Sequence, residues 1–261
     1  MVINPLNFSI IIPTLNEEKA LPILLHDLSE QTYPHFEIII VDGFSQDKTK
    51  TKVEQFIEKN PHLPISFYQV EKHNVSFQRN FGALHARNEW IIFMDADNQL
   101  PNFFLQGITY QLEKNANKVD LFSTLVHLSS ADNRKPFYRT IAQGINLFLA
   151  ARYKSSQPLS FGAMIGIRRA IFPKIRFNEE SKVMEDSLFV KKARQLGYKF
   201  KLFSEPTFAY SMRRIKGRGL FRTAGSSFMM QMRYIFGDEF TDRDYGYKML
   251  GGQAYEKKSP S

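Results

Sequence analysis

The stretch that decides the fold is EWIIFMDADNQLP, residues 89–101, in which an apolar run ends abruptly in acids. Trp90 to Met94 are apolar and rich in isoleucine and aromatic side chains, which is the composition of a buried strand. Asp95 and Asp97 follow, and extended backbone aims residues i and i+2 to the same side. Two such carboxylates repel each other unless a cation or a proton lies between them. The stretch therefore predicts a polar site at the tip of a buried strand.

Strand-like runs alternate with helix-like runs around this stretch. Leu21, Leu24, Leu25 and Leu28, for example, have the i, i+3, i+4, i+7 spacing of a helix. The predicted strands are residues 8–12, 37–41, 65–70 and 90–94, and the last predicted helix between them is residues 76–87. This order predicts an α/β protein with a mainly parallel central sheet flanked by helices. In such sheets ligands bind beyond the carboxyl ends of the strands.

Beyond residue 118 the alternation loosens. Strands are predicted at residues 119–127, 161–167 and 200–203, and helices at residues 137–152 and from Glu185 to a stop at Gly197. The glycines of FGAMIGI, residues 161–167, predict a strand whose backbone can approach a ligand closely. We expect one domain over residues 1–250, divided at residue 118, and a polar tail over residues 251–261.

Composition excludes several classes of site. The 261 residues contain no cysteine, so disulfides, thiolate metal sites and a cysteine nucleophile are excluded. The first apolar run lacks a basic flank and is interrupted by Pro13 and Asn16, and no run nears the length that spans a bilayer. We therefore expect a cytoplasmic protein.

The net charge is +9, and much of the excess lies late in the chain. The residues concerned are Arg213, Arg214, Lys216, Arg218, Arg222 and Arg233. Such a segment suits nucleic acid, anionic lipid or phosphorylated substrates, and it equally suits a plain solvated surface. The basic residues are followed by Phe221, Phe228 and several methionines, a pattern compatible with peripheral contact at the inner face of an anionic membrane.

Three predicted strands end in polar residues. Thr14 and Glu17 follow the first strand, Asp42 the second, and Asp95 and Asp97 the fourth. Because the carboxyl ends of parallel strands share one edge, these residues predict a single site. Neither G-x-G-x-x-G nor G-x-x-x-x-G-K-[ST] is present, so neither kind of glycine-rich phosphate loop fits.

Four stretches resemble, in this order, the motif series of family 2 glycosyltransferases of the GT-A fold. They are SIIIPTLNEEKALPILLHDL (9–28), IIIVDGFSQDKT (38–49), RNFGALHARNEWIIFMDAD (79–97) and MEDSLFVKKARQLGY (184–198). Each alone is weak, but four in order, each at a strand–helix junction, are specific. The resemblance covers residues 7–205. It implies a GT-A-type, Rossmann-like fold, with residues 1–118 binding the nucleotide-sugar and a smaller acceptor-side half at 119–250.

The resemblance also implies roles for the donor-side residues. Pro13, Thr14 and Glu17 would line the nucleotide pocket, and Asp42 would meet the base or ribose. Arg79 would approach the nucleotide or the diphosphate.

Asp95, Ala96 and Asp97 match the D-x-D motif of the family, in which the last acid holds a divalent metal and the first usually meets the ribose. Asp95 and Asp97 are thus the candidate metal ligands, and carboxylate oxygens favour a hard cation, Mg²⁺ or Mn²⁺. The alternative is a polar strand end in which Asp97 caps the next helix.

Asp186 matches the second acid of the family's "ED" pair, the catalytic base, with Glu185 and Gly162 on the acceptor side. A base opposite the leaving group gives in-line displacement with inversion of the anomeric carbon, by analogy with inverting glycosidases. We expect the helix dipole to hold Asp186 ionised. The alternative is that Asp186 or Glu185 merely caps its helix.

Two departures from the family pattern affect the choice of substrate. Gly43 stands where members often have a second acid, so base selectivity stays open. QMRY, residues 231–234, is a poor copy of the Q-x-x-R-W motif of processive members, which argues against processive polymer synthesis.

The predicted function is metal-dependent, inverting transfer of a sugar from a nucleotide-diphosphate donor to a hydroxyl of a sugar, lipid-linked or other acceptor. The resemblance suits surface glycan or glycolipid synthesis. A nucleotide-sugar-binding protein without turnover is the first alternative, and a basic nucleic-acid-binding protein is the second. No nucleic acid is expected as a partner, because the basic residues form no recognisable nucleic-acid-binding module. A sugar-phosphate nucleotidyltransferase lacks support, since its glycine-rich start is missing.

Overall fold

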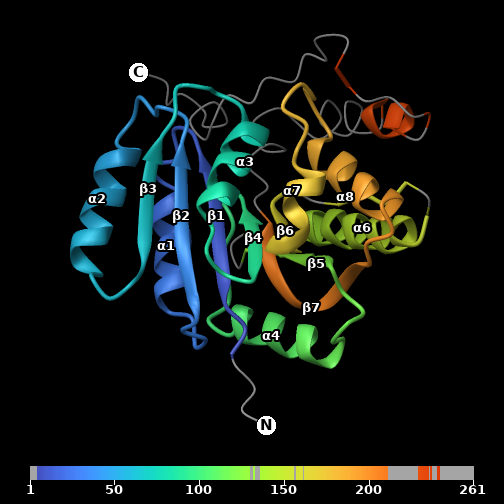
Figure 1. The fold of residues 1–261 in the computed structure, drawn as a ribbon, viewed down its shortest axis with the longest axis horizontal. Coiled ribbons are helices and arrows are strands. Elements are labelled where there is room, and N and C mark those ends of the chain that lie inside the picture. The colour runs from blue at the N-terminus through green and yellow to red at the C-terminus, as the bar shows by residue number, and fades with distance from the viewer. Residues whose placement is uncertain are drawn as a thin grey trace.

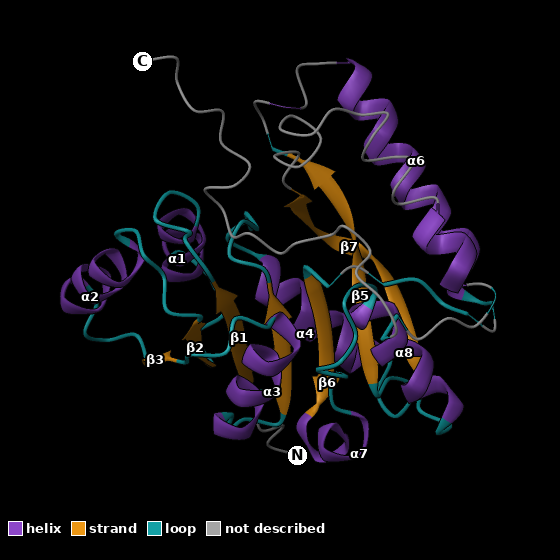
Figure 2. Ribbon diagram, turned by 90° about the horizontal axis from the view of Figure 1, so that it is seen from above, coloured by secondary structure: helices purple, strands orange, loops and turns teal. Residues whose placement is uncertain are grey.

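A mixed sheet of seven strands, with helices on both faces, organises the described part of the chain (Figures 1 and 2). The computed structural model describes residues 5–129, 132, 136–155, 157–160, 162–210, 229–234, 236 and 240–241. The strands are β1 (Phe8–Thr14), β2 (Phe36–Asp42), β3 (Ile65–Gln69), β4 (Trp90–Met94), β5 (Leu121–Leu128), β6 (Met164–Arg168) and β7 (Phe200–Tyr210). Their order across the sheet is β3-β2-β1-β4-β6-β5-β7.

All pairings in this sheet are parallel except those of β6. That strand runs antiparallel to β4 on one side and to β5 on the other. The start of β6 therefore lies beside the carboxyl end of β4, with Met164 paired to Met94. This one reversed strand brings residues 162–164 to the edge where the parallel strands end.

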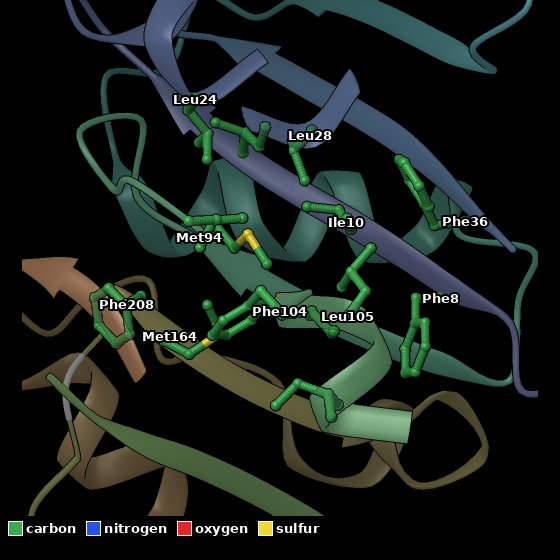
Figure 3. Packing of buried hydrophobic residues seen from close by; sticks show 14 of the residues in the cluster. Phe8, Ile10, Leu24, Leu28, Phe36, Met94, Phe104, Leu105, Met164 and Phe208 are labelled. Atoms are coloured by element: carbon green, nitrogen blue, oxygen red, sulfur yellow. The ribbon is translucent and has the colours of Figure 1, made fainter. Parts of the chain in front are cut away.

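The two faces of the sheet bury separate hydrophobic clusters because successive side chains along a strand alternate. Ile10 and Ile12 of β1 point to one face, and Ile11 points to the other. The first face is covered by α1 (Leu21–Ser29), α2 (Thr49–Lys59) and α4 (Phe104–Lys114), and α6 (Pro136–Tyr153) packs against β5 and β7. Figure 3 shows Leu24 and Leu28 of α1 packed over the sheet beside Ile10.

The second face is covered by α3 (Val75–His85), α7 (Phe172–Ile175) and α8 (Glu185–Gln195), with a 3₁₀ turn, Arg169–Ile171, leading into α7. Because α3 and α8 lie on the same face, residues far apart in the sequence can meet between them. The site described below lies at this meeting point.

The structure confirms the expected order of elements as far as β4 and the predicted helix that begins at Glu185. Gly197 has φ +84°, the left-handed conformation expected just after a helix end. Two features of the fold were not fully predicted. The strand predicted to end at residue 203 continues to Tyr210, through the polar Ser204 and Glu205 that interrupt its apolar pattern. The helix α4 was not predicted, although Phe104, Leu105, Ile108 and Leu112 do supply a buried face.

The basic segment lies almost wholly outside the described residues, as do Phe161 and the tail over residues 251–261; of the six basic residues only Arg233 is described. The membrane prediction built on Arg213, Arg214 and Arg218 is therefore not tested. Within the described ranges, no helix is long and apolar enough to cross a membrane.

Two helix glycines give a test of how closely α3 packs on the sheet. A Cβ on Gly82 of α3 would lie 2.4 Å from Cγ2 of Ile11, whereas a Cβ on Gly144 of α6 would meet nothing within 4 Å. We expect Gly82→Ala to lower the free energy of unfolding by about 1–3 kcal/mol through overpacking. Gly144→Ala should raise it by up to about 1 kcal/mol through helix propensity. Urea unfolding of both variants measures this, and a stabilised Gly82→Ala protein would contradict the close packing.

Candidate active site

The polar ends of β1, β2 and β4 do meet at one edge of the sheet. These strands are parallel, and Thr14 at the end of β1 pairs in register with Asp42 at the end of β2. The backbone N–H of Gly43 then donates to the carbonyl of Thr14 at 2.8 Å. At the end of β4, the N–H of Asp95 donates to the carbonyl of Ala163 at 3.2 Å, joining the D-x-D segment to the approach to β6.

The predicted nucleotide-side residues lie in two loops that are bonded to each other. Pro13 and Thr14 are buried at the end of β1. The N–H of Asn16 donates to Oγ of Ser45 at 2.7 Å, and the N–H of Glu17 donates to Oγ1 of Thr49 at 2.8 Å. The loops after β1 and β2 are therefore held as one surface.

Asp42 is fully buried, and its carboxylate is already well supplied with donors. It accepts hydrogen bonds from the N–H of Ser45 at 3.0 Å and from Nε2 of Gln69 at 3.1 Å, and it also accepts from the Ser45 hydroxyl. This network fixes the side chain of Asp42 at the carboxyl end of β2.

Three residues with side chains adopt left-handed backbone at the entrances to the site. They are Asn16 at φ 51°, Phe44 at φ 61° and Met184 at φ 59°. Such conformations cost about 1–3 kcal/mol each and persist where the surrounding structure holds them. They lie directly before Glu17, after Gly43 and before Glu185, so left-handed backbone accompanies three of the predicted segments.

The D-x-D acids lie on a turn and not on extended backbone. The N–H of Asn98 donates to the carbonyl of Asp95 at 3.1 Å, closing a turn over Ala96 and Asp97. The expectation that strand geometry aims the two acids together is therefore wrong, yet they remain close. The side chain of Asp95 is 38% exposed; its partial burial, and then repulsion from Asp97, raise the pKa of Asp95, although Arg79 opposes the shift.

The alternative for Asp97 does not hold, because α4 begins at Phe104 with Phe103 as its N-cap and no side-chain cap. Asp97 lies six residues before this cap and cannot satisfy the first N–H groups of the helix.

A buried arginine joins the donor side to the acceptor side. Arg79 of α3 is 2% exposed; its Nη2 lies 3.0 Å from Oδ1 of Asp95, and its Nη1 lies 3.1 Å from Oε1 of Glu185. Nη2 also donates to the carbonyl of Gly162 at 3.0 Å. All of these partners belong to the protein itself, so three of the predicted site residues meet at one guanidinium.

Asp186 is held by two backbone donors. Its Oδ2 accepts from the N–H of Gly162 at 2.6 Å, and its Oδ1 accepts from the N–H of Ser187 at 2.7 Å. Burial, followed by repulsion from Glu185, raises the pKa of Asp186 to about 7. The expectation that the helix start keeps this acid ionised is wrong, because those two effects outweigh the backbone donors and Arg79. A carboxyl that titrates near neutral pH is well matched to accept a proton.

The glycines of the 161–167 segment serve the protein's own packing. A Cβ on Gly162 would lie 2.8 Å from Nη2 of Arg79, and a Cβ on Gly166 would lie 2.1 Å from the ring of Phe122. Gly162 therefore clears space for a guanidinium, and Gly166 clears space for a core ring. The sequence pattern predicted the close approach of a ligand, whereas the close neighbours of these two glycines are side chains of the protein.

The donor set at the D-x-D turn fits a hard cation. Asp95 and Asp97 offer carboxylate oxygens, and across the described residues no group of three or more His, Cys, Asp and Glu side chains could hold a metal ion. Mg²⁺ is usually bound by one or two carboxylates, with waters and substrate phosphates as its other ligands. Two acids on an accessible turn suit that arrangement better than an all-protein cage.

Sequence reasoning missed two amides that fix this edge. Nε2 of Gln78 donates to the carbonyls of Thr14 and Val41 at 2.9 and 2.7 Å, and Nδ2 of Asn98 donates to the carbonyl of Ala163 at 2.5 Å. For Gln78 the available signal was the density of polar residues, Ser76, Gln78, Arg79 and Asn80, at the start of a helix that must cover a sheet. Buried polar side chains there imply hydrogen-bonding partners.

The fold and this site together define a GT-A-type glycosyltransferase. The chain belongs to glycosyl transferase family 2, whose family model matches residues 9–176.

Among curated relatives, the chain is similar to the poly(ribitol-phosphate) beta-N-acetylglucosaminyltransferase TarS of Staphylococcus aureus strain Mu50. The two are 26% identical over 216 residues, which is 80% of this chain and 36% of the relative. It is also similar to the amylovoran biosynthesis glycosyltransferase AmsB of Erwinia amylovora, 26% identical over 79% of this chain and 70% of the relative. The minor teichoic acid biosynthesis protein GgaB of Bacillus subtilis is 23% identical over 79% of this chain and 23% of its own length. The chain thus spans about a third of the first relative it matches.

Two solved structures show the same fold. A mannosyltransferase from Pyrobaculum calidifontis, in complex with GDP-Man and Mn²⁺, aligns with a TM-score of 0.71 at 21% identity, over 91% of this chain and 66% of that chain. Residues 1–349 of S. aureus TarS in complex with UDP-GlcNAc align with a TM-score of 0.60 at 21% identity, over 92% and 69%.

The raised pKa of Asp186 predicts a pH-dependent stability. Its folded pKa of about 7 lies above the ordinary 3.8, so the folded state binds more protons between these values and loses stability as pH rises through that window. Asp186→Asn does not titrate, so its free energy of unfolding relative to the parent should rise from pH 4 to pH 7 and level off above.

Urea unfolding at closely spaced pH values measures this difference. Asn has one acceptor oxygen for the two backbone donors, so a constant offset is expected, and only the slope tests the pKa. If the difference in unfolding free energy between Asp186→Asn and the parent protein does not change from pH 4 to pH 8, the pKa of Asp186 is not raised in the folded protein.

Proposed function

We propose that this protein transfers a sugar from a nucleotide-diphosphate donor to an acceptor hydroxyl, with a divalent cation and with inversion at the anomeric carbon. One observation carries the proposal. Gly162 donates to Asp186 through its N–H and accepts from Arg79 through its carbonyl, while Arg79 also pairs with Asp95. A cation-binding pair and a carboxyl that titrates near neutral pH therefore share one small site.

Asp95 and Asp97 would hold Mg²⁺ or Mn²⁺ together with the donor diphosphate. The cation, when bound, stabilises the negative charge that develops on the leaving diphosphate. The chain's own task there is to present two carboxylates at fixed positions. The turn closed by Asn98 and the contact of Asp95 with Ala163 do this.

The nucleoside would lie on the joined loops after β1 and β2, beside Pro13, Thr14, Glu17 and Asp42. The mutual hydrogen bonds of these loops support the assignment, because a pre-formed surface binds without first being ordered. Gly43 stands where members often have a second acid, and a Cβ there would lie 3.3 Å from Nε2 of Gln78, so the choice of base stays with the remaining contacts.

Asp186 would take the proton of the acceptor hydroxyl as that oxygen attacks the anomeric carbon. Its Oδ2 and Oδ1 are oriented by the N–H groups of Gly162 and Ser187, and its pKa of about 7 matches a base working near neutral pH. One base opposite the leaving group produces inversion. Gly162 and Glu185 border it on the acceptor side.

The acceptor would belong to a surface polysaccharide or glycolipid. The names of the relatives support this: one is a poly(ribitol-phosphate) beta-N-acetylglucosaminyltransferase, one a minor teichoic acid biosynthesis protein and one an amylovoran biosynthesis glycosyltransferase. A cytoplasmic location with peripheral contact at an anionic membrane remains part of the proposal, based only on the sequence of the basic segment. A nucleotide-sugar-binding protein without turnover is the competing function, and release of free sugar or transfer from a donor distinguishes the two.

Metal dependence is tested by nucleotide binding. Calorimetric titration with UDP and with GDP should give tighter binding in Mn²⁺ than in EDTA for whichever nucleotide the protein accepts, because Asp95 and Asp97 would hold a cation that offsets the charge of the phosphates. Asp97→Asn should remove most of this gain and leave binding in EDTA unchanged. Equal affinity of the parent protein in Mn²⁺ and in EDTA would refute the metal site.

The catalytic base is tested by transfer rates. Asp186→Asn should lower turnover by about 10²–10⁴-fold, since the base is lost, while donor affinity stays near that of the parent. Transfer by Asp186→Asn at close to the parent rate would rule out this mechanism.

Glu185→Gln provides the matched control. Because Glu185 raises the pKa of Asp186, its removal should move the rising limb of the kcat/KM profile to lower pH, with turnover retained above neutrality. If Glu185→Gln is the inactive variant and Asp186→Asn is active, the roles of the two acids are reversed.

A further inference from the structure

We propose that Arg79 is a positioning residue that couples the donor-binding turn to the helix carrying the base. The inference rests on the proposed function of the site. It adds to the role that the family resemblance implies for this arginine.

The first support is where the guanidinium's hydrogen bonds go. Nη1 is committed to Glu185, and Nη2 is shared between Asp95 and the carbonyl of Gly162. These three partners come from α8, from the turn after β4 and from the approach to β6. The side chain is 2% exposed, so these bonds are made in a setting shielded from solvent.

The second support is the enclosure of the guanidinium. Its Cζ lies 5.2 Å from the ring centroid of Phe177, and that ring stacks on Phe189 with centroids 4.1 Å apart. The backbone of Gly162 also packs closely on the guanidinium, since a Cβ at this position would lie 2.8 Å from Nη2. The guanidinium of Arg79 is therefore held between its carboxylate partners by the ring of Phe177 and by the backbone of Gly162.

The third support is that α3 is tied to the same wall by a second residue. Nδ2 of Asn80 donates to the carbonyl of Phe177 and to Oε1 of Glu179, both at 3.0 Å, and Oδ1 of Asn80 accepts from the N–H of Phe177 at 3.0 Å. Helix α3 is thus held in place against Phe177 and Glu179, in the segment before α8. If Arg79 moved toward one of its two carboxylate partners, it would lose its contact with the other.

Shared charge makes the coupling energetic as well as geometric. A guanidinium that bonds two carboxylates holds an orientation that serves both, so removing one leaves it free to close on the other. Loss of Glu185 should therefore bind Asp95 more tightly to Arg79 and make Asp95 less available to a divalent cation. A change on the acceptor side is in this way transmitted to the donor side.

The test compares Glu185→Gln in two backgrounds, the parent protein and Arg79→Gln. The probe is UDP or GDP with Mn²⁺, whichever the parent binds, measured by calorimetry. With Arg79 present, Glu185→Gln should weaken Mn²⁺-dependent binding by about threefold or more, a coupling ordinary for residues that share a partner. In the Arg79→Gln background the same change should alter affinity by less than about 1.5-fold, since the shared partner is gone.

Glu89→Gln is the matched control, because it removes a carboxylate that pairs with a different arginine. Oε1 of Glu89 lies 2.6 Å from Nη1 of Arg168, at the opposite end of β4 from Asp95. This variant should leave nucleotide affinity unchanged in both backgrounds. A Glu185→Gln effect of equal size with and without Arg79 would overturn the proposal. If Arg79→Gln does not fold, Arg79→Lys replaces it, because one ammonium cannot span both carboxylates.

A ligand-free measurement separates this inference from the proposed function. The changes in unfolding free energy caused by Asp95→Asn and by Glu185→Gln should not sum to the change in the double variant when Arg79 is present. In the Arg79→Gln background the two changes should sum to that of the double variant. If no nucleotide binds but this non-additivity is present, the proposed function fails and the coupling stands. If nucleotides bind with Mn²⁺ and the effects are additive in the parent, the coupling fails alone.

Discussion

A buried positive charge with two carboxylate partners is the constraint on which the site depends. Removing a guanidinium from water is expensive, and Arg79 is tolerated at 2% exposure because Asp95, Glu185 and a carbonyl surround it. Burial alone would lower its pKa, but the neighbouring acids outweigh this and raise it, so the group stays charged. Each of its partners lies on a different element. Any sequence that keeps this arginine buried must therefore keep those elements together.

The sheet makes this contact possible through its reversed strand. If β6 ran parallel to β4, its amino-terminal approach would lie at the opposite edge, and Gly162 could not reach Arg79. Since β6 is antiparallel, Gly162 and Ala163 arrive beside Asp95. Parallel strands thus bring the proposed donor-side residues to this edge, and one antiparallel strand brings the proposed acceptor-side residues.

The sequence predicted this fold well where each element has a period of its own. The helix spacing of Leu21 to Leu28 and the apolar run of Trp90 to Met94 are local signals, and both elements formed as expected. The polar strand ends also predicted their shared edge correctly. By contrast, β7 beyond residue 203 is held by its pairing with β5, a long-range contact that leaves no apolar pattern in Ser204 and Glu205.

The electrostatics of the site were harder to predict than its location, for the same reason. A helix start is visible in a sequence, and it suggested an ionised Asp186. Burial and the charge of Glu185 oppose ionisation of Asp186, and both depend on how closely α8 packs against α3 and β6.

Arg79 draws these elements together, yet it contacts Glu185 and not Asp186, so its charge reaches the candidate base only through space. The base is therefore left partly uncompensated, with its pKa near neutrality, whereas Glu185 has a direct partner. The arrangement divides the two adjacent acids into one that holds the helix in place and one, the proposed base, that has no side-chain ion pair with Arg79.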